Sequence, residues 1–122
     1  MIQCAIYTRS ATSDTLGMAV ERELVRTCIL ARSGKGVSVL PDRYEDSGAS
    51  GNTTDRPELR RLMADVAAGK VGFVAVRCFA RLARDPAVLA ELLSFFRSHG
   101  VEVVSTTENF DPTIFAGEGG TA

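Results

Sequence analysis

The sequence predicts an α/β fold in three layers, with a mostly parallel central sheet of four to five strands and helices on both of its faces. A sequence pattern and a general rule of chain connection support this prediction. Short apolar runs alternate along the chain with longer segments whose apolar residues recur every three or four positions. Strands joined by helical crossovers run parallel and leave their helices on the faces of the sheet. The 122 residues, 45% hydrophobic and 24% charged, fit one globular domain, which we assign to residues 1–110.

The N-terminal third contains the first predicted strand and the first predicted helix. Residues 2–7 (IQCAIY) are apolar and rich in strand formers, whereas the Ser and Thr residues that dominate residues 8–15 predict a loop. An amphipathic helix is expected over residues 16–31, ending before Gly34. Its apolar stripe consists of Leu16, Val20, Leu24, Cys28 and Ala31.

The middle of the chain predicts a strand, a long loop and a second helix. Residues 37–40 (VSVL) have a strand pattern that continues to Tyr44, and the Gly-, Ser- and Thr-rich residues 45–55 are the most loop-like internal segment. A helix is expected over residues 57–68, because proline suits the first helical position and Gly69 can end the helix. Its apolar face consists of Leu59, Leu62, Met63 and Val66.

Two further strands and one further helix follow. Residues 71–76 (VGFVAV) form a short, continuously apolar run, which is typical of a strand covered on both faces, and we predict that this strand is central. Asp85 followed by a proline is an N-cap signature that opens a helix over residues 86–98, before Gly100. Residues 101–105 (VEVVS) are predicted to form the next strand.

Arginines gather in the loops that follow these strands. In parallel sheets, ligands bind at the carboxyl ends of the strands, and here the loops at those ends are residues 8–15, 45–56, 77–85 and 106–113. Three of the four loops contain arginine, namely Arg9, Arg56, Arg77, Arg81 and Arg84. A single arginine in a loop is more often a solvated residue in a weak ion pair. Several converging guanidinium groups instead suit a phosphodiester, which they can bind in bidentate fashion.

Four segments resemble, in order and spacing, the catalytic domain of the serine recombinases, the group of resolvases, invertases and large serine integrases. The segments are residues 5–13 (AIYTRSATS), 42–57 (DRYEDSGASGNTTDRP), 59–69 (LRRLMADVAAG) and 81–84 (RLAR). The most specific part is the stretch that contains Ser50, Gly51 and the Asp-Arg-Pro triplet at residues 55–57. The resemblance covers the chain up to Asp111.

This resemblance implies site-specific DNA recombination or integration of a mobile element. A serine hydroxyl would cleave DNA through a covalent 5′-phosphoseryl intermediate, without a metal or any other cofactor, and strand exchange would take place in a tetramer. The implied partners are therefore DNA and further copies of the chain, as a dimer or a tetramer. By position, the implied phosphate-binding arginines are Arg9, Arg56, Arg81 and Arg84, and two loop residues of the same site are Asp46 and Ser50.

Three positions depart from the family's pattern. The nucleophilic serine of the family stands two residues after the first arginine, where this chain has Ala11. The aspartate before the third arginine is Ala80 here, which predicts that Arg81 lacks its neighbouring carboxylate partner, and a glutamine early in the first helix is Glu21. An alanine cannot form an oxygen ester, so the standard covalent step is not available at this position.

Three hypotheses follow for the activity. The first is a recombinase domain that is inactive or impaired. The second is an enzyme that uses Ser10 or Ser13 as its nucleophile; an extended backbone would turn Ser10 to the face opposite Arg9, which disfavours it, and Ser13 fits a turn or a helix cap. The third is a non-enzymatic interaction or regulatory module that pairs with an active recombinase.

Charge and cysteine content indicate the cellular setting. A net charge of -1 predicts that DNA binding is local and weak, since autonomous DNA-binding modules are usually basic. Three widely spaced cysteines indicate neither a disulfide framework nor a zinc site. Without an N-terminal signal pattern or a membrane-length apolar run, we expect a cytoplasmic protein. Residues 111–122 are expected to form a flexible tail, where the family's long dimerisation helix would begin.

Overall fold

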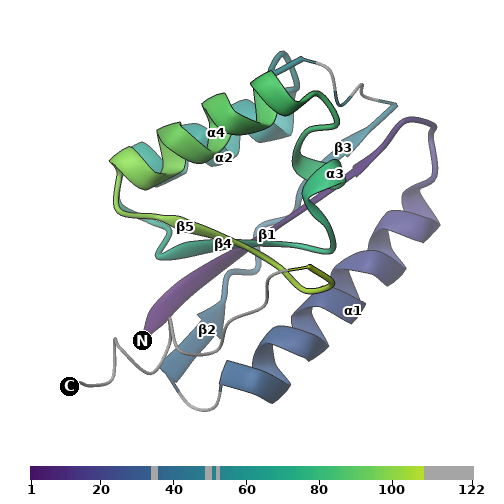
Figure 1. Ribbon diagram of the computed structural model, residues 1–122. Helices are drawn as coiled ribbons and strands as arrows, with labels where there is room; N and C mark the ends of the chain where they lie inside the picture. The colour runs from purple at the N-terminus through teal and green to yellow at the C-terminus, as the bar shows by residue number, and fades with distance from the viewer. Residues whose placement is uncertain (34–35, 49–50, 52, 109–122) are drawn as a thin grey trace.

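The computed structural model describes residues 1–33, 36–48, 51 and 53–108 (Figure 1). In chain order, the elements are β1 (Ile2–Ser10), α1 (Thr15–Ser33), β2 (Val37–Val39), β3 (Tyr44–Ser47), α2 (Pro57–Ala67), β4 (Phe73–Val76), α3 (Phe79–Leu82), α4 (Pro86–Ser98) and β5 (Glu102–Ser105). The predicted tail at residues 111–122 lies outside the described residues. No helix in the described ranges is both long enough and apolar enough to cross a membrane.

The sheet has five strands, and every pairing in it is parallel. Its order is β2-β1-β4-β5, and β3 also pairs with β1. The long strand β1 pairs with β2 near its start, where Ile2 lies opposite Val37, and with β3 near its end, where Tyr7 lies opposite Tyr44. Pro41 stands between β2 and β3, where a proline cannot donate a ladder hydrogen bond. The predicted second strand is therefore two short strands along one edge of β1.

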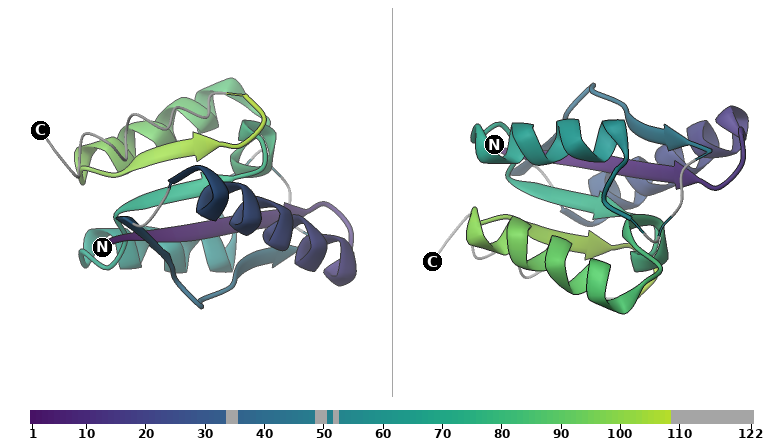
Figure 2. Two further views of the ribbon diagram at one scale, coloured as in Figure 1. Left: turned by 90° about the horizontal axis from the view of Figure 1, so that it is seen from below. Right: turned by 90° about the horizontal axis from the view of Figure 1, so that it is seen from above.

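Helices cover both faces of the sheet, as the sequence predicts. Helix α1 lies on one face, and α2 and α4 lie side by side on the other (Figures 1 and 2). Alternate residues of β1 divide between the two cores: Ala5 and Tyr7 belong to the core under α2 and α4, and Cys4 and Ile6 to the core under α1. All four side chains are fully buried, so β1 is the central scaffold of the domain.

Two segments that were predicted as loops are strands instead. Residues 8–10 extend β1, and residues 45–47 belong to β3. The two segments pair with each other, with Thr8 opposite Glu45 and Ser10 opposite Ser47. Ser, Thr and Asp favour turns when only local sequence is considered, but a parallel partner satisfies their backbone groups here. This pairing carries the backbone of β1 as far as Ser10.

Helix α1 turns a different face to the sheet than its apolar stripe predicts. Leu16, Val20 and Leu24 are exposed, at 76%, 53% and 52% of their surface. The buried face instead consists of Met18, Glu21, Arg22, Val25 and Ile29. Two charged residues on that face have partners, since Arg22 donates to the carbonyl oxygen of Leu40 (3.0 Å) and Glu21 pairs with an arginine of a distant loop. Tertiary partners for these charges outweigh the simpler apolar pattern.

The ends of α2 and α4 agree with their predicted signals. Pro57 begins α2, and Gly69, at a φ of 80°, follows its end. The Asp85 side chain caps α4 by accepting the backbone N–H groups of Ala87 (2.8 Å) and Val88 (3.3 Å). Gly100, at a φ of 75°, allows the turn from α4 into β5.

Candidate functional site

Three loops meet at the carboxyl ends of β1, β3 and β4. The backbone N–H of Arg84, from the third loop, donates to the carbonyl oxygen of Gly51 in the second loop (2.9 Å). The N–H of Gly48 donates to the carbonyl oxygen of Thr12 in the first (3.2 Å). The three arginine-bearing loops therefore form one continuous surface, which is the convergence that the sequence predicts.

Arg9 lies near the end of β1 and is buried beneath these loops. Its Nε donates to the carbonyl oxygen of Arg81 (2.9 Å) and its Nη2 to that of Ala80 (2.7 Å). Burial lowers the pKa of Arg9, and the nearby positive charges of Arg56, Arg81 and Arg84 act in the same direction. Arginine stays protonated nevertheless, so the four guanidinium groups repel one another and favour an anion beside them.

Arg56 is enclosed by protein, with no exposed surface. Its guanidinium donates to the carbonyl oxygen of Thr53 (2.9 Å), to the Tyr7 hydroxyl (3.0 Å) and to the carbonyl oxygen of Leu82. It thereby ties the second loop to β1 and to the third loop. The charge of Arg56 is thus buried beneath the surface, and its side chain holds the second and third loops against β1.

Asp46 continues the same network from β3 into α2. It accepts a hydrogen bond from the Tyr7 hydroxyl (2.8 Å) and from the backbone N–H groups of Glu58 (3.0 Å) and Leu59 (2.9 Å). Burial raises the pKa of Tyr7, so its hydroxyl keeps the proton that it donates to Asp46. A carboxylate at a helix N-terminus satisfies N–H groups that have no partner within the helix. Asp46 thus fixes the start of α2 next to Arg56.

Arg81 and Arg84 are the more accessible members of the cluster. The Arg81 side chain is 40% exposed, and its Nε donates to both carboxylate oxygens of Glu21, at 3.0 and 3.1 Å. The expectation that Arg81 lacks a carboxylate partner is therefore wrong, because α1 supplies one across the fold in place of the residue at Ala80. The sequence does not indicate this pair, because the apolar stripe of α1 predicts that Glu21 lies on the exposed face of the helix.

Gly51 allows the second loop to lie directly against two arginines. A Cβ atom at this position would stand 2.8 Å from Cγ of Arg84 and 2.9 Å from Nη2 of Arg9. Any larger residue would push these side chains apart, so the glycine within the Ser-Gly signature has a steric reason. Its neighbour Ser50, a predicted site residue, lies outside the described residues.

Ala11, which the resemblance predicts to stand at the nucleophile position, is exposed just after the end of β1. Ser10 is the last residue of β1 and shares the alternation of Cys4 and Ile6, which face α1, whereas Arg9 shares that of Tyr7. The Ser10 hydroxyl lies 3.3 Å from that of Thr12 and accepts the Thr12 backbone N–H (3.2 Å). Ser13 is exposed in the turn before α1.

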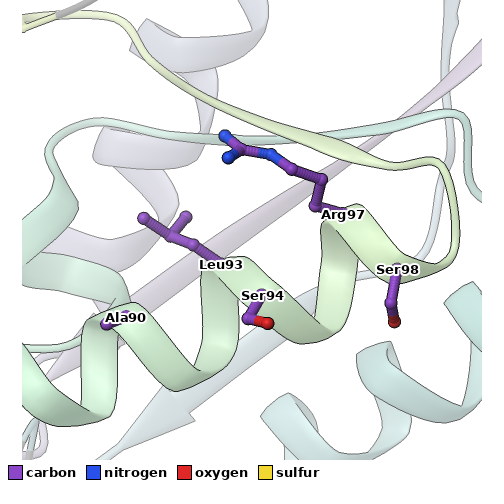
Figure 3. Close-up of a pocket in the computed structure, with 5 residues that line it drawn as sticks. All are labelled: Ala90, Leu93, Ser94, Arg97 and Ser98. Atoms are coloured by element: carbon purple, nitrogen blue, oxygen red, sulfur yellow. The ribbon is translucent and has the colours of Figure 1, made fainter.

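Two surface hollows are lined by none of the four clustered arginines, Arg9, Arg56, Arg81 and Arg84. The larger, of about 500 Å³, lies along α4, where Leu93 and Arg97 line it (Figure 3). The other, of about 390 Å³, lies along α1 beside the exposed Val20 and Leu24. Within the described residues, no group of three or more His, Cys, Asp or Glu side chains could hold a metal ion.

Comparisons with known proteins agree with the fold. A sequence model described as "Resolvase, N terminal domain" matches residues 4–118. Among solved structures, the N-terminal catalytic domain of TP901-1 integrase is similar at 24% identity and a TM-score of 0.77, over 93% of this chain and 88% of that one. A search of curated proteins found no match.

Two further structures have the same fold. The C-terminal catalytic domain of ISC1926 TnpA, an IS607-like serine recombinase, is 24% identical at a TM-score of 0.75, over 86% of this chain and 70% of that one. A resolvase family site-specific recombinase from Streptococcus pneumoniae is 22% identical at a TM-score of 0.73, over 94% of this chain and 83% of that one.

Proposed function

The chain belongs to the resolvase N-terminal domain family, the catalytic domain of serine recombinases, and we propose that it binds the DNA backbone through its arginine cluster without cutting it. The observation that carries this proposal is the combination of a preserved set of converging arginines with an alanine at the nucleophile position. The family acts on DNA, which makes a phosphodiester the expected ligand of these arginines.

Binding is supported by the geometry of the cluster. Arg81 and Arg84 present accessible guanidinium groups, and the buried charges of Arg9 and Arg56 add to their field. Guanidinium groups in this arrangement suit the non-bridging oxygens of a phosphate. The net charge of -1 limits the attraction to this local surface, so the affinity is expected to be modest and strongly dependent on salt.

The absence of cleavage is supported by the side chains near Arg9. Ala11 has no hydroxyl, and Ser10 belongs to the strand face opposite Arg9. A nucleophile must stand close to the phosphorus and in line with the leaving oxygen, and a hydroxyl on the other face of a strand does not meet that requirement. Pairing with an active recombinase is a compatible role, because such a domain would bind DNA without cleaving it.

The binding test compares Arg84→Ala with Arg97→Ala on a short labelled duplex, by fluorescence anisotropy at several salt concentrations. Arg97 is a matched control, since it is exposed on α4, pairs with Glu102 at the start of β5 (3.3 Å) and lies outside the cluster. Losing Arg84 should weaken binding and reduce the slope of log K against log salt by about one. Equal effects of the two substitutions would contradict binding at the cluster.

The cleavage test uses nicked duplexes of random sequence, on which a covalent protein–DNA adduct would accumulate. We expect no adduct with the unaltered chain. An adduct that disappears on Ser10→Ala or Ser13→Ala would overturn the proposal and establish the alternative in which one of these serines replaces the missing nucleophile.

A further inference from the structure

We propose that Glu21 is a positioning residue, which holds Arg81 by one edge of its guanidinium, directs the other edge to a phosphate and lowers the affinity of the site. This inference rests on the proposed phosphate-binding function and adds how the same site is controlled. It concerns a contact between α1 and α3, at residues far apart in the sequence.

The contact occupies only part of the Arg81 guanidinium. The Nε group donates to Oε1 of Glu21 at 3.0 Å and to Oε2 at 3.1 Å. Within the described residues, no hydrogen bond engages the two terminal nitrogens of Arg81. A guanidinium can bind an oxyanion through its two terminal nitrogens or through Nε and one terminal nitrogen. With Nε already held, the phosphate is left with the end-on mode.

Glu21 is itself held firmly, which makes it a suitable anchor. Its side chain is 11% exposed and lies on the buried face of α1. The next residue, Arg22, donates to the carbonyl oxygen of Leu40 (3.0 Å) and so fixes the helix against the segment after β2. Because the buried carboxylate is already paired with its cation, little further side-chain conformational entropy is lost when a ligand binds.

The contact also bears on Arg9. The carbonyl oxygen of Arg81 accepts the hydrogen bond from Arg9 Nε at 2.9 Å. Releasing the Arg81 side chain would therefore loosen the residue whose backbone orients Arg9. Glu21 thus acts on two arginines of the cluster, on one directly and on the other through a backbone oxygen.

The carboxylate has two effects of opposite sign on phosphate binding. It orients Arg81, which favours binding, and its negative charge stands close to the place where a phosphate would lie, which opposes binding. Glutamine separates the two effects, because its amide oxygen can still accept from Nε while the charge is gone. Alanine removes both the charge and the orientation.

The experiment measures duplex binding by the full chain and by Glu21→Gln, Glu21→Ala and Glu23→Gln. Glu23 is the matched control: it lies on the same helix, its side chain is 60% exposed, and its contacts to Arg22 and Arg26 are 3.7 Å long. We expect Glu21→Gln to bind about threefold to tenfold more tightly at low salt, Glu21→Ala to bind less tightly than Glu21→Gln, and Glu23→Gln to stay within about twofold of the unaltered chain.

The Arg81 Nε–H signal in an NMR spectrum provides a second readout that does not depend on DNA. It should be protected from solvent exchange in the unaltered chain and in Glu21→Gln, and exposed in Glu21→Ala. Equal affinities of Glu21→Gln and Glu23→Gln would overturn the charge effect, and equal affinities of Glu21→Gln and Glu21→Ala would overturn the positioning effect.

The same data separate this inference from the proposed function. Duplex binding that is lost in Arg84→Ala but unchanged in Glu21→Gln would leave the proposed function intact and sink the role of Glu21. No duplex binding by any variant, with the Nε–H signal still protected, would overturn the proposed function and the inference that rests on it.

Discussion

At the scale of single residues, the site depends on a chain of buried hydrogen bonds. The Tyr7 hydroxyl accepts from Arg56 and donates to Asp46, and Asp46 in turn accepts two backbone N–H groups at the start of α2. One neutral hydroxyl therefore lies between a buried cation and a buried anion. Removing it would leave a polar atom on each side with one partner fewer, in surroundings that water does not reach.

Tyr7→Phe is expected to lower the free energy of unfolding by about 2 kcal/mol, because it takes one hydrogen-bond partner from Arg56 and one from Asp46. Urea denaturation would measure the change. Tyr44→Phe is the control: the buried Tyr44 hydroxyl also donates to an aspartate, Asp65, at 2.7 Å, but Asp65 is 17% exposed and has Arg61 and Lys70 as further partners, so the loss should cost about 1 kcal/mol or less. A larger loss in the control than in Tyr7→Phe would contradict the special role of the network.

At the scale of elements, α1 shows that the face a helix buries is chosen by its partners. The exposed stripe of Leu16, Val20 and Leu24 has the more regular apolar spacing, yet Val25 and Ile29 are the residues that reach the core. The turn of the helix that buries them also brings Glu21 to Arg81. The orientation of α1 about its own axis therefore decides both which residues pack against the sheet and whether Glu21 reaches Arg81.

Leu24→Ala should change the free energy of unfolding by no more than about 0.5 kcal/mol, because half of the side chain is already exposed. Ile29→Ala on the same helix should cost about 2 to 5 kcal/mol, because Ile29 is fully buried against β1 and its removal leaves a cavity. Thermal or urea unfolding of the two variants measures the difference. A costly Leu24→Ala with a mild Ile29→Ala would mean that α1 faces the sheet as its apolar stripe predicts.

At the scale of the whole molecule, β1 links the two cores to the site. Its residues alternate between the layer of α1 and the layer of α2 and α4, and its end places the buried Arg9 beneath the loops of the site. A side chain at the centre of this strand can meet solvent only when the sheet separates. Opening of that kind is close to global unfolding.

The rate at which the Cys4 thiol is alkylated measures this opening. Burial raises the pKa of the Cys4 thiol to about 12, so below that pH the group stays a protonated, poorly nucleophilic thiol in the folded chain. At mildly alkaline pH we expect iodoacetamide to modify the partly exposed Cys28 and Cys78 first, and Cys4 only as denaturant unfolds the chain. Mass spectrometry of the alkylated peptides would follow each site, and modification of Cys4 at the rate of the other two would contradict a rigid central strand.

The sequence by itself determined the α/β class, the parallel sheet, the ends of α2 and α4, and the meeting of the arginine loops. These features follow from local patterns and from the rule that the carboxyl ends of parallel strands share one edge of the sheet. Family resemblance added the prediction that Ala11 stands where the family has its nucleophilic serine, which the chain's own composition does not reveal.

Only the tertiary structure decided the rest. Polar residues after Tyr7 form strand because β3 pairs with them. Arg56 is buried because the second and third loops close over it beside β1, and Glu21 pairs with Arg81 because α1 turns its charged face inward. In each case a polar group is held by partners far away in the sequence. Hydrogen bonds and ion pairs between distant residues leave no periodic signal in the chain, whereas the burial of apolar residues does.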